Sequence, residues 1–244
     1  MRARRGALVA TVLVAAAACS GAGASGGSGQ RARVTVFAAS SLTDAFTAIG
    51  KTYDAVHRSS TTFSFAGSQD LVAQIGNGAP ADVVATADAA TMAKIADELV
   101  SRAHVLARNR LVIVTQPGNP HHVHALSDLA APGLTLVLAD PSVPAGTYAA
   151  AALRSAAVTV HPASLELDVR AVLTKVELGE ADAGVVYATD AASAGRRVSS
   201  VPIADAPVAT YEIGALDGKG SDFVDYALSA AGQRELRRRG FLPP

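Results

Sequence analysis

The chain has 244 residues, half of them hydrophobic, and its 21 basic residues balance its 21 acidic residues. This composition favours a folded chain, large enough for two small lobes or one larger domain, over a disordered one. The balanced charge argues against a nucleic-acid partner, and a single cysteine excludes an internal disulfide.

The first thirty residues have the pattern of an export signal followed by a tether. Arg2, Arg4 and Arg5 precede an uncharged apolar run at 6–18, which is too short to span a bilayer as a stable helix. The run ends at Cys19, and a segment rich in serine, glycine and alanine follows. Bacterial lipoproteins carry a similar arrangement, in which the cysteine becomes the acylated first residue of the mature protein.

We therefore expect a signal peptide at 1–18 and a lipid-anchored flexible tether at 19–30, lipidated at Cys19. The implied location is the outer face of the cytoplasmic membrane. A plain secreted protein that is cut nearby is the alternative.

From residue 33 onward, short runs of β-branched residues alternate with amphipathic stretches. Such alternation predicts parallel strands covered by helices. The expected elements are strand 34–37, helix 42–49, strand 61–65, helix 68–76, strand 82–86, helix 89–98 and strand 110–115.

A cluster of turn formers at 116–120, Gln-Pro-Gly-Asn-Pro, separates this series from a second one. The second series predicts helix 126–129, strand 135–138, helices 145–156 and 168–178, and strands 183–187 and 198–203. Strand 208–215 and helices 222–230 and 232–239 then return to the first lobe. We expect an α/β fold with one lobe at 31–109 plus 206–244 and a second at 110–205, which together form a hinged clamp.

Four expected helices begin with an N-terminal signal directly after a strand or turn. The four junctions are Ser40-Ser41, Gly67-Ser68, Pro144-Ala145-Gly146 and Asp168-Val169. Helix starts present free backbone N–H groups and a partial positive charge, so several that converge can hold an anion without lysine or arginine. Each signal alone is also the ordinary way to cap a helix.

The order and local sequence of these junctions resemble the molybdate-binding proteins of ABC transporters. The similar segments cover nearly all of the chain after the tether. They are Phe37 to Ala45, Phe65 to Ser68 with Gly78 to Asp82, Asp140 to Tyr148, Asp168 to Arg170, and Gly184 to Tyr187 with Asp190-Ala191.

This resemblance implies a two-lobe periplasmic-binding-protein fold of type II, with a mostly parallel sheet flanked by helices in each lobe and a ligand cleft at the hinge. The implied ligand is molybdate or tungstate, with no cofactor, and the implied partners are an ABC permease and its ATPase subunits. A monomer is expected. Matching motif by motif places the oxyanion on Ser41, Ser68, Ala145, Val169 and Tyr187, with Ser40 as a further candidate contact.

Two neighbours of these positions need a separate interpretation. Gln69-Asp70 stands where the family usually has small residues. We expect Asp70 to be stabilised by the helix dipole in the first turn and to point to solvent. Arg170 directly follows Val169, and we expect it to pair outside the anion site.

Three rival functions remain for comparison. Sulfate or phosphate is the nearest competing ligand. His121, His122 and His124 lie close enough in sequence to suggest a divalent metal. An enzyme would need Ser41 or Ser68 as a nucleophile, but the sequence has no G-x-S-x-G elbow, P-loop or dinucleotide fingerprint. We therefore expect a binding protein with no resident metal and no catalytic residues.

Overall fold

The computed structural model of the chain describes residues 31–244. The expected signal peptide and tether, with Cys19, lie outside the described residues. None of the helices within 31–244 is long and apolar enough to cross a membrane.

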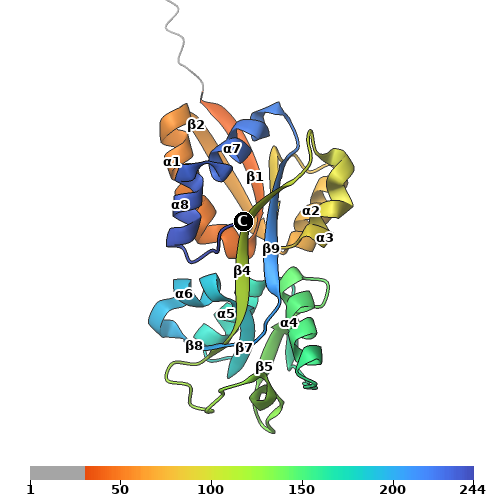
Figure 1. Ribbon diagram of the computed structural model, residues 1–244, viewed down its shortest axis with the longest axis vertical. Helices are drawn as coiled ribbons and strands as arrows, with labels where there is room; N and C mark the ends of the chain where they lie inside the picture. Colours follow the sequence, from red (N-terminus) through yellow and green to blue (C-terminus); the bar gives the residue numbers. More distant parts are fainter. Residues whose placement is uncertain (1–30) are drawn as a thin grey trace, which may run out of the picture. The chain divides into compact units, whose positions relative to one another are not determined.

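Within these residues, nine strands form one connected sheet with two parts that share a single long strand, β4. Figure 1 shows β4 running beside β9 from one part to the other. The strands of the first part are β1 (Ala32–Ala39), β2 (Ser59–Ala66), β3 (Val83–Thr86), β9 (Val208–Ala215) and the first residues of β4 (His104–Thr115). The second part holds the rest of β4 with β5 (Leu136–Ala139), β6 (Ser164–Glu166), β7 (Ala183–Tyr187) and β8 (Ser199–Pro202).

Each part combines parallel and antiparallel pairs. β1 is parallel to β2 and β3, and β5 is parallel to β6 and β7, because helices cross over between these strands. β9 is antiparallel to β3 and β4, and β4 is antiparallel to β7 and β8. The two long strands that connect the parts run in opposite directions, so the sheets are mixed where the sequence predicted mostly parallel pairing.

β4 changes its partners in its middle. Arg110 pairs with Val208 of β9, while the next residue, Leu111, pairs with Tyr187 of β7. We call 31–109 together with 206–244 half I, and 110–205 half II. These are the limits predicted for the two lobes, and the division into two lobes stays a prediction.

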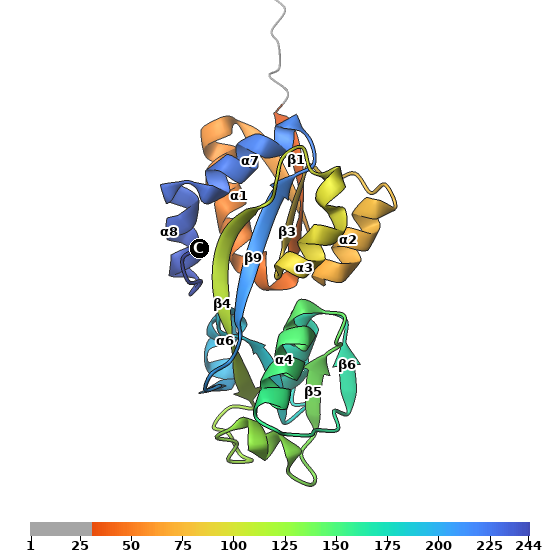
Figure 2. The same ribbon diagram turned by 45° about the vertical axis from the view of Figure 1, so that its right-hand side comes forward.

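In half I, helices cover both faces of the sheet (Figures 1 and 2). The alternation along β1 explains the two layers, since Val34 and Val36 pack into the main core whereas Phe37 points to a second cluster with Leu71 of α2. On the main-core face lie α1 (Thr43–His57), α7 (Gly218–Leu228) and α8 (Ala230–Arg238). On the other lie α2 (Ser68–Gly76), α3 (Ala89–Met92) and the 3-10 segment Ala93–Glu98.

In half II, α4 (Pro144–Ser155) and α5 (Val169–Glu177) pack on β5 and β7. The apolar side of α5, with Val172 and Val176, is wholly buried. α6 (Ala188–Ala194) directly follows β7, and Leu126–Ala130 and Gly195–Arg197 are short 3-10 turns.

Most expected elements are present, and three differences matter for the site. β4 begins at His104 rather than at residue 110, and β6 and α6 were not expected. α6 has the sequence Ala-Thr-Asp-Ala-Ala-Ser-Ala, whose small residues give no apolar periodicity. Its start is nevertheless stabilised by the Asp190 carboxylate, which accepts the backbone N–H of Tyr187.

Candidate functional site

A small cavity of about 10 Å³ receives its lining from both halves. It is lined by Ala39, Ser40, Ser41, Ala66, Gly67, Ser68 and Ala87 of half I, and by Val143, Pro144, Ala145, Val169 and Tyr187 of half II. The structure thus brings the five predicted site residues together, with Ser40 beside them. No lining side chain carries a charge, and Asp70 and Arg170 are not among them.

Ser41 reaches the cavity from the 3-10 turn Ser40–Leu42, which joins β1 to α1. It is buried, and its Oγ lies 2.8 Å from the hydroxyl of Tyr211 on β9. The carbonyl of Ser40 accepts a 2.6 Å hydrogen bond from Thr43 Oγ1, which fixes the turn that carries both serines.

Ser68 is the first residue of α2 and is also buried. Its Oγ accepts a 3.0 Å hydrogen bond from the backbone N–H of Ala87. A serine hydroxyl keeps its own hydrogen to donate when its oxygen accepts. Because Ser68 lines the cavity, the hydroxyl hydrogen can be donated to an acceptor there.

The starts of α4 and α5 supply backbone donors. α4 begins without a side-chain cap, so the amide of Ala145 is not used by a capping side chain. At α5 the Asp168 carboxylate accepts the N–H groups of Arg170 and Ala171, at 2.7 and 3.0 Å. That cap leaves the amide of Val169 for another acceptor.

The start of α4 also explains a glycine in the motif. A Cβ on Gly146 would lie 2.1 Å from the carbonyl oxygen of Asp140 and 2.5 Å from that of Ala139. Only glycine therefore allows the first turn of α4 to lie against the end of β5, which brings Ala145 to the cavity.

Tyr187 closes the cavity from the end of β7 and is 1% exposed. Within residues 31–244 its hydroxyl oxygen has no hydrogen-bond partner. An unpaired buried hydroxyl carries a free-energy cost of about 1–3 kcal/mol, which a ligand acceptor would remove. Burial raises the pKa of Tyr187 well above its ordinary value, so the phenol stays protonated and able to donate.

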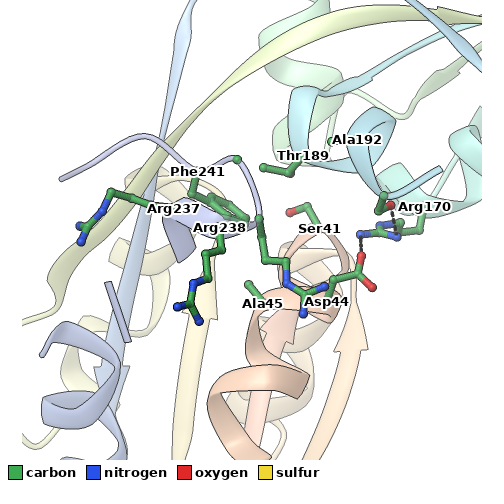
Figure 3. A pocket seen from close by; sticks show the side chains of 12 residues that line it. Ser41, Asp44, Ala45, Arg170, Thr189, Ala192, Arg237, Arg238 and Phe241 are labelled. Atoms are coloured by element: carbon green, nitrogen blue, oxygen red, sulfur yellow. Dashed lines mark hydrogen bonds and ion pairs between the residues drawn. The ribbon is translucent and has the colours of Figure 1, made fainter. Parts of the chain in front are cut away.

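Arg170 connects the halves, and its side chain lines a second, larger cavity (Figure 3). Its Nη2 lies 2.6 Å from Asp44 Oδ2 of α1 in half I, and its Nε lies 2.7 Å from Asp190 Oδ1 of α6 in half II. Its Nη1 donates to Ser193 Oγ at 3.0 Å. The guanidinium is thus committed to these partners, in agreement with the expected pairing outside the anion site.

These groups border a larger cavity of about 360 Å³ (Figure 3). Ser41 lines this cavity as well, together with Phe241 and the exposed residues Arg237, Arg238 and Arg239. The two cavities therefore share the turn between β1 and α1.

A second contact between the halves lies over Gly67. Gln69 Nε2 donates a 2.8 Å hydrogen bond to the carbonyl oxygen of Leu167, just before α5. A Cβ on Gly67 would lie 2.3 Å from that same oxygen and 2.4 Å from Gln69 Nε2. Gln69 therefore fills the space over Gly67 and holds the start of α5.

The histidines proposed for a rival metal site lie in half II, away from this cavity. His121 Nε2 lies 3.1 Å from Asp182 Oδ1, with 43% of the His121 side chain exposed. Among residues 31–244, no group of three or more histidine, cysteine or acidic side chains is placed to hold a metal ion.

Sequence reasoning did not find Tyr211 or the partners of Arg170. Tyr211 belongs to an alternating buried pattern in β9 with Ala209 and Ile213, which identifies a core position. A buried tyrosine usually needs a partner for its hydroxyl, and this was the available signal. The contact of Arg170 with Asp44 spans 126 positions, and no local pattern reports it.

A family model described as bacterial extracellular solute-binding protein matches residues 34–242. The molybdate-binding protein ModA of Mycobacterium tuberculosis strain H37Rv is 39% identical over 249 residues, which cover 98% of this chain and 95% of that protein.

Two solved structures share the fold. The periplasmic molybdate-binding protein of Azotobacter vinelandii has a TM-score of 0.76 and 18% identity, covering 86% of this chain and 99% of that one. The sulfate-binding protein SubI of Mycobacterium tuberculosis also has a TM-score of 0.76, with 16% identity and 87% coverage of both chains. The chain belongs to the ModA family of bacterial extracellular solute-binding proteins, with the type II periplasmic-binding-protein fold.

Proposed function

We propose that this chain captures molybdate, and also tungstate, and delivers the anion to the permease of an ABC importer. The observation that carries the proposal is the set of neutral donors around the cavity. Ser68 has its oxygen occupied by Ala87 and its hydrogen free, and Tyr187 has a buried hydroxyl with no partner in 31–244. The amides of Ala145 and Val169 add backbone donors from two helix starts.

Such a set suits a tetrahedral oxyanion that only accepts hydrogen bonds. Each hydrogen bond to a charged partner contributes about 1.5–3 kcal/mol. On the order of five to seven of them supply the roughly −8 to −12 kcal/mol of micromolar to nanomolar binding. No metal and no catalytic group is needed, and the related proteins are named as binding proteins rather than enzymes.

Sulfate is the main competitor, because a sulfate-binding protein has the same fold. The proposal favours molybdate and tungstate because Mo–O and W–O bonds are longer than S–O bonds. Donors fixed on helix starts cannot follow a smaller ion inward, so sulfate would leave some of them without an acceptor.

The rest of the proposal concerns the place where the protein acts. We infer export and lipid anchoring at Cys19 on the outer face of the cytoplasmic membrane, from the arginines, the apolar run and the tether of the first thirty residues. We further propose that the binding subunit is a monomer. It forms a complex only with the permease and its ATPase subunits.

Calorimetric titration of the purified protein with molybdate, tungstate, sulfate, phosphate and zinc tests the function. We expect saturable one-to-one binding of molybdate and tungstate and no comparable heat from the other three. Tighter binding of sulfate or phosphate than of molybdate would mean that molybdate is not the ligand. Binding of zinc alone would support the metal-binding alternative.

A further inference from the structure

The start of α5 is held to half I on both sides of Val169, whose amide is one of the proposed donors. Before Val169, the carbonyl oxygen of Leu167 accepts a 2.8 Å hydrogen bond from Gln69 Nε2 of α2. After it, Arg170 Nη2 lies 2.6 Å from Asp44 Oδ2 of α1 (Figure 3). Two helices of half I therefore contact the segment that carries Val169.

Both contact residues of half I lie close in sequence to a serine of the site. Gln69 follows Ser68 in the first turn of α2, and Asp44 lies in the first turn of α1, shortly after Ser41. The two contacts thus connect the segments of both serines to the segment of Val169. An anion that accepts hydrogen bonds from all three can leave only when these segments separate, and their separation breaks both contacts.

The two contacts are each weak, for different reasons. Gln69 Oε1 is buried without a hydrogen-bond partner within 31–244, so this contact forms one hydrogen bond and leaves one oxygen unsatisfied. The Asp44 side chain is 39% exposed, so solvent and dissolved ions screen its pair with Arg170. Weak contacts of this kind suit a site that closes on an anion and later releases it.

We propose that Gln69 and Asp44 are positioning residues, which hold the Val169 amide close to the serines and so set how long a bound anion stays in the site. The inference rests on the proposed function and deepens it, because it assigns control of release to two side chains that do not line the small cavity. Their loss should change the dissociation rate more than the association rate, since the anion is encountered before the contacts form.

Gln69→Ala removes the hydrogen bond, and Asp44→Asn removes the charge of the ion pair. We expect each variant to release molybdate about threefold faster, with an association rate within about twofold of wild type. Rapid filtration measures both rates, with radiolabelled molybdate and an excess of unlabelled molybdate for dissociation. Because one separation breaks both contacts, the double variant should release molybdate about tenfold faster, the product of the single effects.

Two matched variants control for composition and charge. Gln74→Ala removes an exposed glutamine from the same helix as Gln69. Asp70→Asn removes an acidic group from the first turn of α2, as Asp44→Asn does in α1. Both controls should release molybdate at the wild-type rate. Release from the controls as fast as from the test variants overturns the proposal, and so does a wild-type rate in either Gln69→Ala or Asp44→Asn.

Salt separates positioning by the ion pair from a general loss of structure. Release from wild-type protein and from Gln69→Ala should accelerate about twofold from low to high sodium chloride, because the ions screen the pair of Asp44 with Arg170. Asp44→Asn should show no such acceleration. Equal acceleration in all three proteins overturns the role of Asp44.

The wild-type protein distinguishes the two levels of inference, and thermal melting of each variant checks folding. If wild-type protein binds no molybdate, the proposed function fails before release is considered. If it binds molybdate and both single variants release it at the wild-type rate, only the role of Gln69 and Asp44 fails.

Discussion

Arg170 and Asp44 meet at the junction of the two halves, with 2.6 Å between the guanidinium Nη2 and the carboxylate Oδ2. The same guanidinium contacts Asp190, which is completely buried. The two ion pairs differ in environment, because 39% of the Asp44 side chain is exposed and none of the Asp190 side chain is. Loss of Arg170 should therefore lower the stability of the protein mainly because Asp190 loses its ion pair.

We predict that Arg170→Gln lowers the free energy of unfolding by about 3–5 kcal/mol, because it leaves a buried carboxylate without its counter-ion. Asp44→Asn should lower it by about 1 kcal/mol at most, since solvent screens the exposed pair. Urea denaturation of both variants measures the difference. Molybdate affinity should fall less in Arg170→Gln than in Ser41→Ala, because the Arg170 side chain does not line the cavity.

The same variant has a predictable pH dependence. Burial raises the pKa of Asp190 to about 6, although Arg170 opposes the rise. A carboxyl group whose pKa is higher in the folded than in the unfolded state stabilises the fold at pH values below its unfolded-state pKa. That stabilisation is lost as the pH rises through the folded-state pKa. Removal of Arg170 raises the pKa further, so the loss of stability should be much smaller at about pH 5 than at about pH 8. Equal losses at both pH values would mean that Asp190 is not the group responsible.

Gly67→Ala tests the contact between the halves. Gly67 has an ordinary φ of −60°, so alanine fits the backbone, but its Cβ would collide with the Leu167 carbonyl oxygen of half II. We predict molybdate affinity about tenfold weaker, or about 1.4 kcal/mol, with little change in the urea midpoint, because half I can fold normally without the contact. Gly76→Ala in the same helix is the control, since nothing lies within 4 Å of its added Cβ. Unchanged affinity in Gly67→Ala would show that the approach of Leu167 is not needed for binding.

The elements that the sequence predicts well are those with local periodicity. Val34 and Val36 alternate with the residues between them, and the apolar residues of α5 repeat at helical spacing, so both elements were expected near their observed bounds. β6 has only three residues and α6 has none of the large apolar side chains that create a period. These two elements depend on tertiary context, which a local pattern cannot report.

The candidate site follows the same rule. Five of its lining residues are predicted from motifs at strand ends, where the backbone conformation is local. Other groups lie beside the site only because segments far apart in the sequence pack together. They are the hydroxyl of Tyr211, the carboxylate of Asp190 and the carbonyl of Leu167. Long-range contacts of this kind determine the partners of buried hydroxyls and carboxylates, and the sequence alone does not contain their geometry.

Ser41→Ala and Ser68→Ala should each weaken molybdate binding by about 1–3 kcal/mol, the scale for removal of a donor from a buried charged acceptor. Ser68→Ala should also cost some stability, because it leaves the N–H of Ala87 without its acceptor. Calorimetry and urea denaturation together separate the two effects. If neither variant binds molybdate more weakly, the serines serve only their helices and the anion lies elsewhere.

Cys19→Ala tests the proposed lipid anchor, since Cys19 lies outside the described residues. A lipid chain contributes about 0.8 kcal/mol for each buried CH₂ group, so its loss should release the protein from the membrane. We predict that wild-type protein sediments with membranes and that the variant is found in the medium. Identical fractionation of the two proteins would refute lipidation at Cys19.

Molybdate affinity should depend little on pH between about 7 and 9. The proposed cage has no lysine, arginine or histidine, and its titratable group, Tyr187, has a pKa raised well above its ordinary value by burial. A tyrosine must be protonated to donate, and deprotonation would also place a negative charge beside the anion. Because the folded-state pKa is raised, that loss begins above the ordinary tyrosine range near 10, and molybdate itself stays a dianion throughout this window.

The same neutrality predicts a weak dependence of the affinity on salt. Exposed charges are screened over about 8 Å at physiological ionic strength, whereas buried dipoles at contact distance are screened far less. Titrations at low and high concentrations of sodium chloride should give dissociation constants within about threefold of each other. Arg237, Arg238 and Arg239 are exposed near the larger cavity, so salt can slow association without changing the cage. The neutral cage would be wrong if affinity fell steeply with salt and if Arg170→Gln lost more molybdate affinity than either serine variant. Both results together would indicate a site that binds the anion through charged side chains.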